Sequence, residues 1–496
     1  MTRGDKTMKY TIMYDKQNPE SIEAYARRLI GKTFYDVIEY AETNKIAQAE
    51  RVKFYGNMAR KGGLGNLLEE LYFGYKANSD QEADFSEAGV ELKATPYEYT
   101  KKGELRAGER LVITMIGYDV PFEMDFYKSH LWNKIQRTLL VYYWRNKELK
   151  SNLLYKIGYV KLFQPPENDL MIIKQDYEII KEKIVSGRAH ELSESDTMYL
   201  GACTKGATAA KSTVPQYYNK DVLARKRAFC FKNSYMTYVL NHYIAGKDTE
   251  IESIVGDKQL LESSTFEMCI EQQIARYTGM SDKELCEKFG REYNSNKAQW
   301  VDLTYKMLGI RSNKAEEFEK ANIVVKSIRI EQNGRIKENM SFPPFLFKKL
   351  VQEKFEDSEI YHYFDETRFF FVVWKKDGDV YRVFDSQLWN MPARDLEYTV
   401  RNGWEQIQRV IGYGVQFRKK ETAKGTVVQN NLPKKADNPI IHIRPHSKQS
   451  AYNLHDGTII GNVKRDANEL PNGEYMTTQS FWINNSYILK QLKCLK

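Results

Sequence analysis

The chain has 496 residues, which is more than one hydrophobic core usually spans, so we expect two domains. Hydrophobic residues make up 42% of the sequence and aromatic residues 13%, which excludes an intrinsically disordered chain. The formal net charge of +9 gives modest support for a polyanionic partner and also fits an ordinary soluble surface.

The cysteines and the N-terminus exclude further classes of protein. The five cysteines are scattered and include no C-x-x-C pair, so the sequence predicts neither a disulfide framework nor a zinc site. The N-terminal segment lacks the apolar core of a signal peptide, and no run approaches membrane-spanning length. We therefore expect a soluble cytoplasmic protein that binds no membrane.

Helical patterns open the first half of the chain. Residues 19–50 mix helical and short apolar patterns, and they predict the entry helices of a first domain. In residues 61–72 apolar side chains recur at helical spacing, and Glu69 and Glu70 flank that stripe. Taken alone, this second pattern indicates an ordinary amphipathic helix.

An acidic and basic motif follows. Asp84 precedes a Glu-x-Lys triplet, in which Glu91 and Lys93 at positions i and i+2 of a short strand point to one face. Gly89 can supply a turn that folds Asp84 against that face, and Pro96 is expected to end the strand. Two carboxylates could then share a hard cation, while the ammonium of Lys93 orients water beside a phosphate. The same spacing also occurs by chance on solvated strands.

These two segments resemble a known family. The run K-G-x-x-G-x-L-L-E of residues 61–69 and the run D-F-x-x-x-G-V-E-L-K-x-x-P of residues 84–96 are similar to MutH, the mismatch-repair nicking endonuclease. They are also similar to the larger GATC-specific type II restriction endonucleases of the Sau-three-A kind, in the PD-(D/E)xK nuclease superfamily. The similarity to the larger enzymes covers most of the chain, and the similarity to MutH covers the first half.

The resemblance implies a fold and an active site. It implies a mixed α/β nuclease fold in which Asp84 and Glu91 hold Mg²⁺, Glu69 assists them as a further ligand, and Lys93 positions water. It also implies that Lys61 contacts DNA.

Two segments continue the first domain. Residues 109–116 predict a buried strand that should pair beside the Glu91 strand and so complete an α/β core. Residues 129–140 predict a helix that leads into a strand, and they resemble a MutH segment whose lysine lies near the active site. Lys134 is the matching position and a predicted DNA contact, although a lone lysine on a helix is more often solvated surface.

Residues 202–212 are small, polar and basic, as in a loop that approaches DNA closely. The loop resembles the base-recognition loop of the family, in which Lys205 matches a lysine that reads a base edge in the major groove. MutH has Arg-Pro before that lysine, whereas Cys203 and Thr204 stand here. Thr204 and Lys205 are the DNA contacts that the resemblance implies.

A basic segment interleaved with aromatic residues follows at residues 225–237. Lysine and arginine contacts to phosphates supply affinity and salt dependence. Phe229 and Phe231 alternate and are expected in the core. The predicted DNA contacts of this segment are Arg227, Lys232 and Tyr235.

The second half contains an altered copy of the catalytic motif. Residues 316–327 align without gaps on residues 83–94, with Glu317 in the place of the aspartate. Val324 stands in the place of Glu91. A metal site cannot keep its geometry when an apolar side chain replaces a carboxylate, so this copy is predicted to be catalytically inactive.

The end of the chain repeats a second segment. Residues 481–487 align on residues 229–235, in the same order along the chain as the first pair of segments. This order predicts two tandem MutH-like folds, of which the second lacks catalysis. We place a catalytic domain at residues 1–245 and a non-catalytic DNA-binding or allosteric domain at residues 250–496.

Two further segments of the second half carry predictions. Residues 442–448 fall where the first copy has its recognition loop, so Arg444 and His446 are predicted DNA contacts, with a plain surface loop as the alternative. Residues 418–440, rich in Lys, Asn, Gly and Pro, predict a mobile loop.

Together these patterns predict a Mg²⁺-dependent type II restriction endonuclease that recognises double-stranded 5′-GATC-3′ and makes double-strand breaks. The GATC sequence follows only from the resemblance. One catalytic set per chain means that cutting both strands of a palindrome needs two chains or two sequential nicks. We therefore expect DNA-dependent self-association, with the second domain binding further DNA or pairing chains.

Two other functions remain as alternatives. One is a MutH-like repair nickase, which would not require the appended second copy. The other is a non-catalytic DNA-binding regulator, which would have little reason to keep a single catalytic set whole.

Overall fold

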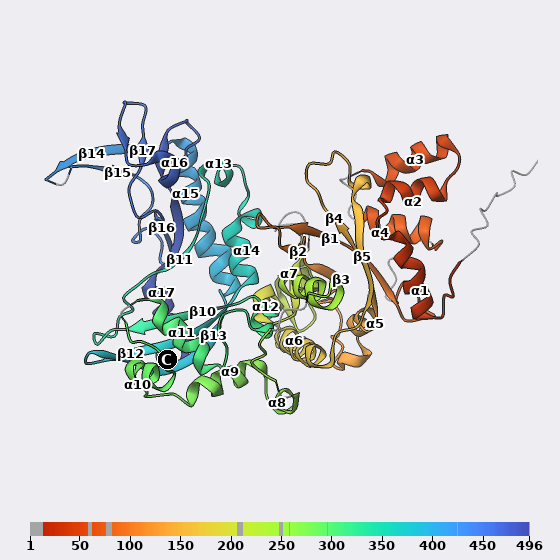
Figure 1. The fold of residues 1–496 in the computed structure, drawn as a ribbon, viewed down its shortest axis with the longest axis horizontal. Helices are drawn as coiled ribbons and strands as arrows, with labels where there is room; N and C mark the ends of the chain where they lie inside the picture. The colour runs from red at the N-terminus through yellow and green to blue at the C-terminus, as the bar shows by residue number, and fades with distance from the viewer. Residues whose placement is uncertain are drawn as a thin grey trace, which may run out of the picture. The chain divides into compact units, whose positions relative to one another are not determined.

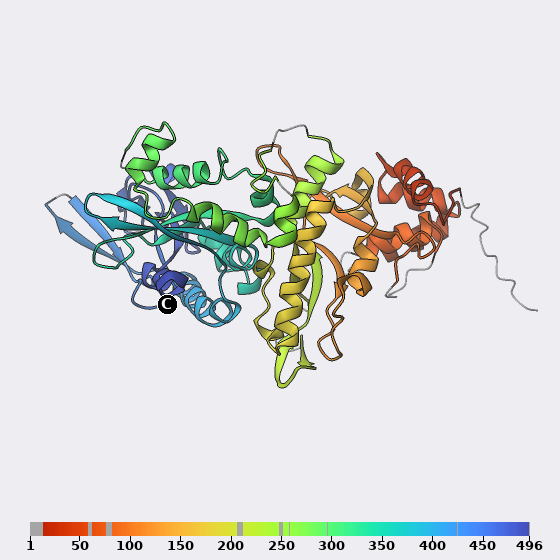
Figure 2. The same cartoon turned by 90° about the horizontal axis from the view of Figure 1, so that it is seen from below.

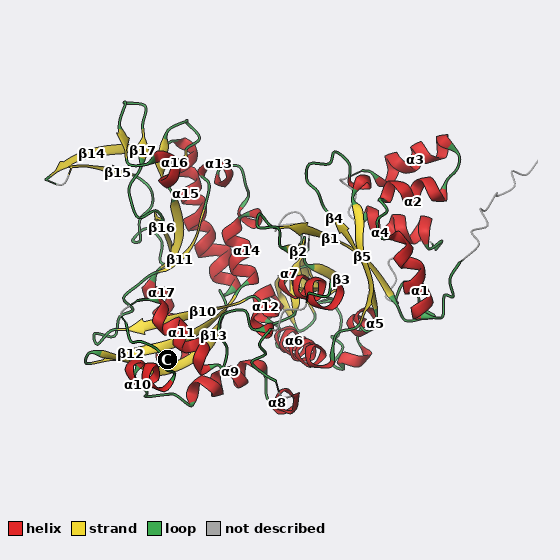
Figure 3. Cartoon of the chain, viewed as in Figure 1, coloured by secondary structure: helices red, strands yellow, loops and turns green. Residues whose placement is uncertain are grey.

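The structure is a computed structural model that describes residues 13–57, 62–75, 82–205, 212–247, 251–256, 258–294, 296–423 and 425–495. The chain contains both helices and strands, as Figure 3 shows, and they form two compact units (Figure 1). Unit 1 comprises Met1–Ile251 and Glu319–Ala321, and unit 2 comprises Glu252–Phe318 and Asn322–Lys496. No helix in the described ranges is both long and apolar enough to cross a membrane.

Unit 1 begins with helices whose apolar faces pack on a sheet. Asn18 and Thr33 cap the first two of them by accepting backbone N–H groups, which offsets the unpaired donors of a helix start. The predicted helix around Glu69 is present, although its last turn, Leu68–Tyr72, is π-helical. The helices are α1 (Pro19–Ala26), α2 (Phe34–Ala41), α3 (Lys45–Tyr55), α4 (Gly63–Leu67), α5 (His130–Ile135), α6 (Glu167–Val185) and α7 (Asn233–Tyr238).

The main sheet of unit 1 has the strand order β2-β1-β4-β5. β1 and β4 are parallel, with Glu91 opposite Thr138, and the other neighbours are antiparallel. Leu92, Leu139 and Val141 from these strands enter the same core as the buried faces of α1, α2 and α4. The strands are β1 (Glu91–Tyr99), β2 (Leu105–Ala107), β4 (Thr138–Trp144) and β5 (Lys156–Phe163).

A second sheet of unit 1 corrects one prediction. The strand expected in residues 109–116 forms as β3 (Leu111–Met115), but it does not pair beside β1. It pairs with β9 (Arg227–Phe231), which in turn pairs with β6 (Leu200–Thr204). The reason is that β4 and β2 already occupy the two edges of β1. A hairpin of β7 (Thr213–Gln216) and β8 (Asn219–Arg225) completes the unit.

The end of β1 also differs from the prediction. Pro96 does not end the strand, which continues to Tyr99. β2 begins to pair with β1 only at Tyr97, so the missing N–H of Pro96 interrupts no bond to that strand. The Pro96 carbonyl still accepts a hydrogen bond from the Gly108 amide at 2.8 Å.

Unit 2 repeats both sheets of unit 1. Its first sheet has the order β10-β12-β13, in which β10 and β12 are parallel, as β1 and β4 are. Its second sheet has the order β11-β21-β16, and its central strand leads directly into a helix, as β9 leads into α7. The strands of these sheets are β10 (Ile323–Ile330), β11 (Met340–Pro344), β12 (Arg368–Asp377), β13 (Val380–Trp389), β16 (Ile441–Pro445) and β21 (Gln479–Ile483).

Helices and small sheets surround the two main sheets of unit 2. The helices are α8 (Lys258–Ser263), α9 (Phe266–Ala275), α10 (Asp282–Lys288), α11 (Ala298–Met307), α13 (Phe347–Leu350), α14 (Glu359–Glu366), α15 (Arg401–Tyr413), α16 (Val463–Asp466) and α17 (Asn485–Gln491). The helix α12 (Glu316–Ala321) is divided between the two units. The smaller strands are β14 (Phe417–Thr422), β15 (Gly425–Asn430), β17 (Tyr452–Asn453), β18 (Ile459–Ile460), β19 (Ala467–Glu469) and β20 (Tyr475–Thr477).

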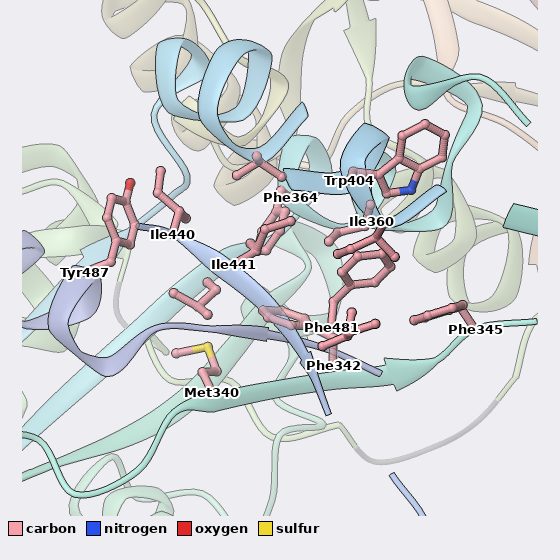
Figure 4. Close-up of a cluster of buried hydrophobic side chains, with 14 of the residues drawn as sticks. Met340, Phe342, Phe345, Ile360, Phe364, Trp404, Ile440, Ile441, Phe481 and Tyr487 are labelled. Atoms are coloured by element: carbon pink, nitrogen blue, oxygen red, sulfur yellow. The ribbon is translucent and has the colours of Figure 1, made fainter. Parts of the chain in front are cut away.

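The core of unit 2 is built from strands of both its main sheets and from the helices α14 and α15. Figure 4 shows Phe342 and Phe481 from neighbouring strands beside Phe364 and Trp404 from the two helices. The rings of Phe342 and Phe364 meet edge to face at 4.9 Å. These contacts are made by residues far apart in the sequence, so unit 2 has a tertiary core of its own.

Much of the segment 418–440, which is predicted as a mobile loop, forms a hairpin, and residues 431–440 have no regular secondary structure. Phe417 to Asn430 fold into the antiparallel hairpin β14–β15, with all six residue pairs in continuous register. Alternating side chains let Phe417 and Val428 pack on the core of unit 2 while their neighbours face solvent.

Candidate active site

The turn before β1 folds as the position of glycine predicted. Gly89 adopts a positive φ of 62°, which glycine reaches without strain. The amides and carbonyls of Phe85 and Val90 exchange hydrogen bonds at 2.9 and 3.2 Å across the turn. Asp84 is thereby brought back onto β1, where its Oδ2 accepts the backbone N–H of Leu92 at 2.8 Å.

Glu91 and Lys93 lie on one face at the start of β1. The Nζ atom of Lys93 lies 2.6 Å from Oε1 of Glu91. Although Glu91 is only 2% exposed, its charge is paired, which is the condition for burying a carboxylate.

Lys134 joins this cluster from the end of α5. Its Nζ atom lies 3.2 and 3.1 Å from the two carboxylate oxygens of Glu91 and 3.2 Å from the carbonyl oxygen of Glu82. Lys134 is itself buried, so these contacts place it beside the carboxylates. Lys134 is a predicted DNA contact, and the structure places its side chain against Glu91, an ion pair that the sequence did not indicate.

Negative charge accumulates in this cluster. Burial, and then the charge of Glu91, raise the pKa of Asp84 to about 6. Burial, and then the charge of Asp84, raise the pKa of Glu69 to about 7. The charges of three carboxylates therefore act on one another. They belong to Glu69 in the π-helical turn, Asp84 in the turn before β1, and Glu91 in β1.

Tyr75 is a neighbour that sequence reasoning missed. Burial, and then the charges of Asp84 and Glu69, raise the pKa of its hydroxyl well above the usual value. The hydroxyl is buried and has no hydrogen-bond partner among the described residues. In the sequence Tyr75 resembles an ordinary core residue, because it stands among other aromatic residues. Its ring does pack against Phe73 and Phe85, so only the structure shows that its hydroxyl lies near the carboxylates.

The predicted DNA contacts of unit 1 fall into two groups. Thr204 and Lys205 are partly exposed at the end of β6, and the Lys205 amide donates to the Lys226 carbonyl oxygen at 2.8 Å. Residues 206–211 of the same loop lie outside the described residues, and so does Lys61.

Arg227, Lys232 and Tyr235 form the second group, and all three are buried. Arg227 donates to the Ala202 carbonyl oxygen at 2.6 Å, and Lys232 donates to the carbonyl oxygen of Thr197. The Tyr235 hydroxyl donates to Asp169 at 3.1 Å. These bonds hold the elements around β9 together, so a structural role accounts for all three side chains.

The altered copy in unit 2 is arranged differently. The carboxylate of Glu317 accepts hydrogen bonds from the Ser253 hydroxyl at 2.7 Å and from the amides of Ile254 and Val255 at 3.0 Å each. Val324 is partly buried against the apolar core. The carboxylate of Glu317 thus secures a turn of the chain.

The predicted contacts of unit 2 lie at the end of β16. Arg444 and His446 are both exposed. The guanidinium of Arg444 lies 5.8 Å from the ring centre of Trp482, and His446 Nδ1 lies 3.3 Å from the Ser480 hydroxyl oxygen.

Known proteins resemble this chain, one of them over most of its length. A family model described as the DNA mismatch repair enzyme MutH matches residues 73–176, which include Asp84, Glu91, Lys93 and Lys134. The type II restriction enzyme Sau3AI of Staphylococcus aureus is 35% identical over 463 residues, which cover 88% of this chain and 93% of that protein. The DNA mismatch repair protein MutH of Vibrio vulnificus strain YJ016 is 26% identical over 218 residues, which cover 44% of this chain and 90% of that protein.

These similarities and the carboxylate and lysine cluster define the class of protein: a MutH-like endonuclease on a mixed α/β fold. The similarity to the Staphylococcus aureus enzyme continues well beyond the MutH-like segment. The chain belongs to the family of type II restriction enzymes. The predicted family and enzyme class are thereby confirmed.

Proposed function

We propose that this enzyme recognises 5′-GATC-3′ in duplex DNA and hydrolyses a phosphodiester bond in each strand, with Mg²⁺ as its cofactor, in the cytoplasm. The observation that carries the proposal is the cluster of Asp84, Glu91, Lys93 and Lys134 at the start of β1. The same cluster lies in a chain that is 35% identical to a type II restriction enzyme.

The donor set fits a magnesium ion. Among the described residues no group of three or more His, Cys, Asp or Glu side chains is arranged to hold a metal ion, which leaves Asp84 and Glu91 as a pair. Mg²⁺ is commonly held by one or two carboxylates and several waters. Burial, and then the charge of Glu91, raise the pKa of Asp84, and the buried Tyr75 hydroxyl lacks a partner in the described ranges, so a hydrated cation would satisfy both groups. When bound, the ion would polarise the phosphate and lower the pKa of a water.

The protein side chains divide the remaining work. Asp84 and Glu91 would hold the cation. Glu69, which lies in the π-helical turn Leu68–Tyr72, would bond to a water molecule of that cation. Lys93 is the more exposed lysine, with 23% of its side chain accessible, so its ammonium can reach an attacking water and the phosphate. Lys134 is buried against Glu91 and would fix the orientation of that carboxylate.

DNA contacts come from both units in this proposal. In unit 1, Thr204 and Lys205 would reach base edges in the major groove, and Lys61 would contact the backbone. Arg227, Lys232 and Tyr235 support the protein structure and are not assigned to DNA. In unit 2, Arg444 and His446 would contact DNA from an exposed strand end.

A catalytic domain at residues 1–245 and a non-catalytic domain at residues 250–496 complete the proposal. Because a palindrome presents two equivalent strands and each chain carries one catalytic set, two chains would meet on DNA. Binding of a further DNA segment by the second domain would raise the local concentration of sites.

The test uses the purified full chain, Mg²⁺ and a plasmid with several GATC sites, prepared with and without adenine methylation. The proposal predicts double-strand breaks whose mapped ends lie at GATC in at least one of the two preparations. It is refuted by nicks in one strand alone, by breaks at another sequence, or by binding without cleavage. Omitting Mg²⁺ should abolish cleavage and leave DNA binding measurable.

A further inference from the structure

A basic two-stranded ribbon extends from unit 2. The hairpin β14–β15, drawn in light blue, reaches beyond the other strands of this unit in two perpendicular views (Figures 1 and 2). Its two strands pair only with each other. Between Phe417 and Asn430 the sequence has four basic residues and one acidic residue. An exposed ribbon of this charge is a surface without an assigned role.

The pleat of the ribbon separates two faces. Side chains alternate along each strand, and directly paired residues share a face. Phe417 and Val428 point to the body of unit 2, where the Phe417 ring meets the Tyr452 ring edge to face at 5.9 Å. Lys419 lies on this same face and forms an ion pair with Asp456 at 2.8 Å.

The opposite face carries the exposed cations. Arg418 pairs across the ribbon with Gln429, and Lys420 pairs with Val427. All four side chains are exposed, and Val427 is 46% accessible. The acidic residue of the ribbon, Glu421, lies on the other face, where it accepts a hydrogen bond from Thr426 at 2.9 Å. One face of the ribbon therefore presents two cations, an amide and an apolar side chain with no carboxylate from the hairpin.

Two further cations of unit 2, Lys435 and Arg444, act on each other. Burial, and then the charge of Arg444, lower the pKa of Lys435, which follows the hairpin in the chain. Lys435 and Arg444 are thus close enough to repel each other, and a polyanion bound to this pair would relieve that repulsion.

We propose that the face of β14–β15 formed by Arg418, Lys420, Val427 and Gln429 docks in the major groove of duplex DNA. A two-stranded ribbon fits the width of this groove. Arginine and lysine neutralise phosphates at its rims, and a glutamine amide can bond to a base edge. The inference rests on the proposed function in one respect, namely that the polyanion is DNA.

The experiment measures the binding of the full chain to a short GATC duplex over a series of salt concentrations, in EDTA so that the duplex stays intact. The double variant Arg418→Ala/Lys420→Ala should lose affinity about tenfold at low salt. It should also reduce the slope of log K against log salt by about 2, since each phosphate contact contributes about 0.9.

A matched control lies one residue away. Lys419→Ala removes a lysine from the same strand but from the opposite face, where it is paired with Asp456, and should keep the wild-type slope. Lys283→Ala/Lys288→Ala removes two exposed lysines of α10 and should keep both the slope and the cleavage rate. Thermal unfolding of each variant should match that of the wild type because the substituted side chains are exposed.

Three results would overturn the inference. The first is a wild-type slope and affinity in Arg418→Ala/Lys420→Ala. The second is an equal loss in Lys419→Ala, which would show a diffuse effect of charge. The third uses polyglutamate as a probe for acidic proteins. If Arg418→Ala/Lys420→Ala binds DNA as the wild type does but no longer binds polyglutamate, the face binds an acidic protein. Failure of the proposed function would appear separately, as a wild-type protein that does not cut GATC DNA.

Discussion

Both units contain a pair of parallel strands that is aligned in the same way, but the side chains at the start of the pair differ. In unit 1, β1 begins with Glu91 opposite Thr138 of β4, and the lysine four residues before Thr138 is Lys134. In unit 2, β10 carries Val324 opposite Phe369 of β12, and the residue four positions before Phe369 is Asp365. The backbone pairing is kept, while the carboxylate has become apolar and the lysine has become acidic.

The aligned acids show the same divergence. Asp84 accepts one backbone hydrogen bond, from Leu92, and its pKa is raised by burial and then by the charge of Glu91. Glu317 accepts three hydrogen bonds from residues 253–255, which uses its charge to hold a turn. A fold can therefore preserve an acidic residue for stability after its neighbours have lost the means of catalysis.

The sharpest test of this difference exchanges an acid for its amide at both positions. Asp84→Asn should lower the cleavage rate by about a thousandfold with little change in stability, because it removes the negative charge of a carboxylate that is proposed to bind the metal ion. Glu317→Gln should keep the cleavage rate of the folded protein and destabilise it by about 2 kcal/mol. The glutamine NH₂ group would replace an accepting oxygen and would face a hydrogen-bond donor of the protein. Cleavage rates and denaturant unfolding measure both effects. Equal loss of cleavage in the two variants would contradict the comparison.

Lys134 provides a second test. Lys134→Met removes both ammonium contacts to a buried carboxylate, so Glu91 loses its orientation and cleavage should fall about a hundredfold. The control is Lys326→Met, at the position in unit 2 that aligns with Lys93. Burial lowers the pKa of Lys326, so replacing it with an apolar side chain should leave cleavage unchanged. Plasmid cleavage at saturating DNA compares the two, and equal rates would remove Lys134 from the site.

Tyr75 should have a smaller effect. Tyr75→Phe deletes a hydroxyl that is buried without a partner among the described residues, so the free energy of unfolding should hold or rise slightly. If the hydroxyl bonds to water near the carboxylates, cleavage should fall by about threefold to tenfold. Phe73→Leu, in the same aromatic cluster, serves as the control for packing, and it should destabilise the protein with little change in the rate per folded molecule.

The smallest predicted effect concerns unit 2 and pH. Burial lowers the pKa of His442 from 6.5 to about 4, and its Nδ1 lies 2.6 Å from Oδ1 of Asn484. The unfolded chain therefore binds a proton more readily than the folded chain. This contribution to stability is complete above about pH 6.5 and is lost as the pH falls toward 4, with about 2 kcal/mol lost by pH 5. His442→Gln should be less stable at pH 7 and show a weaker dependence on pH in denaturant unfolding. A dependence equal to that of the wild type would contradict this assignment.

Much of the site follows from local sequence. The period of a strand places Glu91 and Lys93 on one face, and Gly89 provides the turn that returns Asp84 to β1. The repeat in the second half predicts the exchange of Glu91 for Val324, and the structure shows that the strand pairing around it is retained.

Other features depend on tertiary contacts that no local pattern encodes. Lys134 reaches Glu91 across 43 residues of sequence because β4 pairs in parallel with β1. The strand β3 is strongly apolar, and its partner is decided by which edges of the sheets remain open. The basic residues near Arg227 suggested DNA binding, but burial against neighbouring carbonyl oxygens cannot be read from their charge.

The central claim is that one catalytic set, at the start of β1, performs all cleavage by this chain. Glu91→Gln tests it most directly, because the amide keeps the shape of the side chain while removing the charge that pairs with both lysines. With Mg²⁺ and a supercoiled plasmid carrying several GATC sites, the account predicts neither nicks nor double-strand breaks, alongside wild-type binding to a GATC duplex. Residual nicking or cleavage at the wild-type rate would show that a second set of residues cuts DNA and would contradict the account.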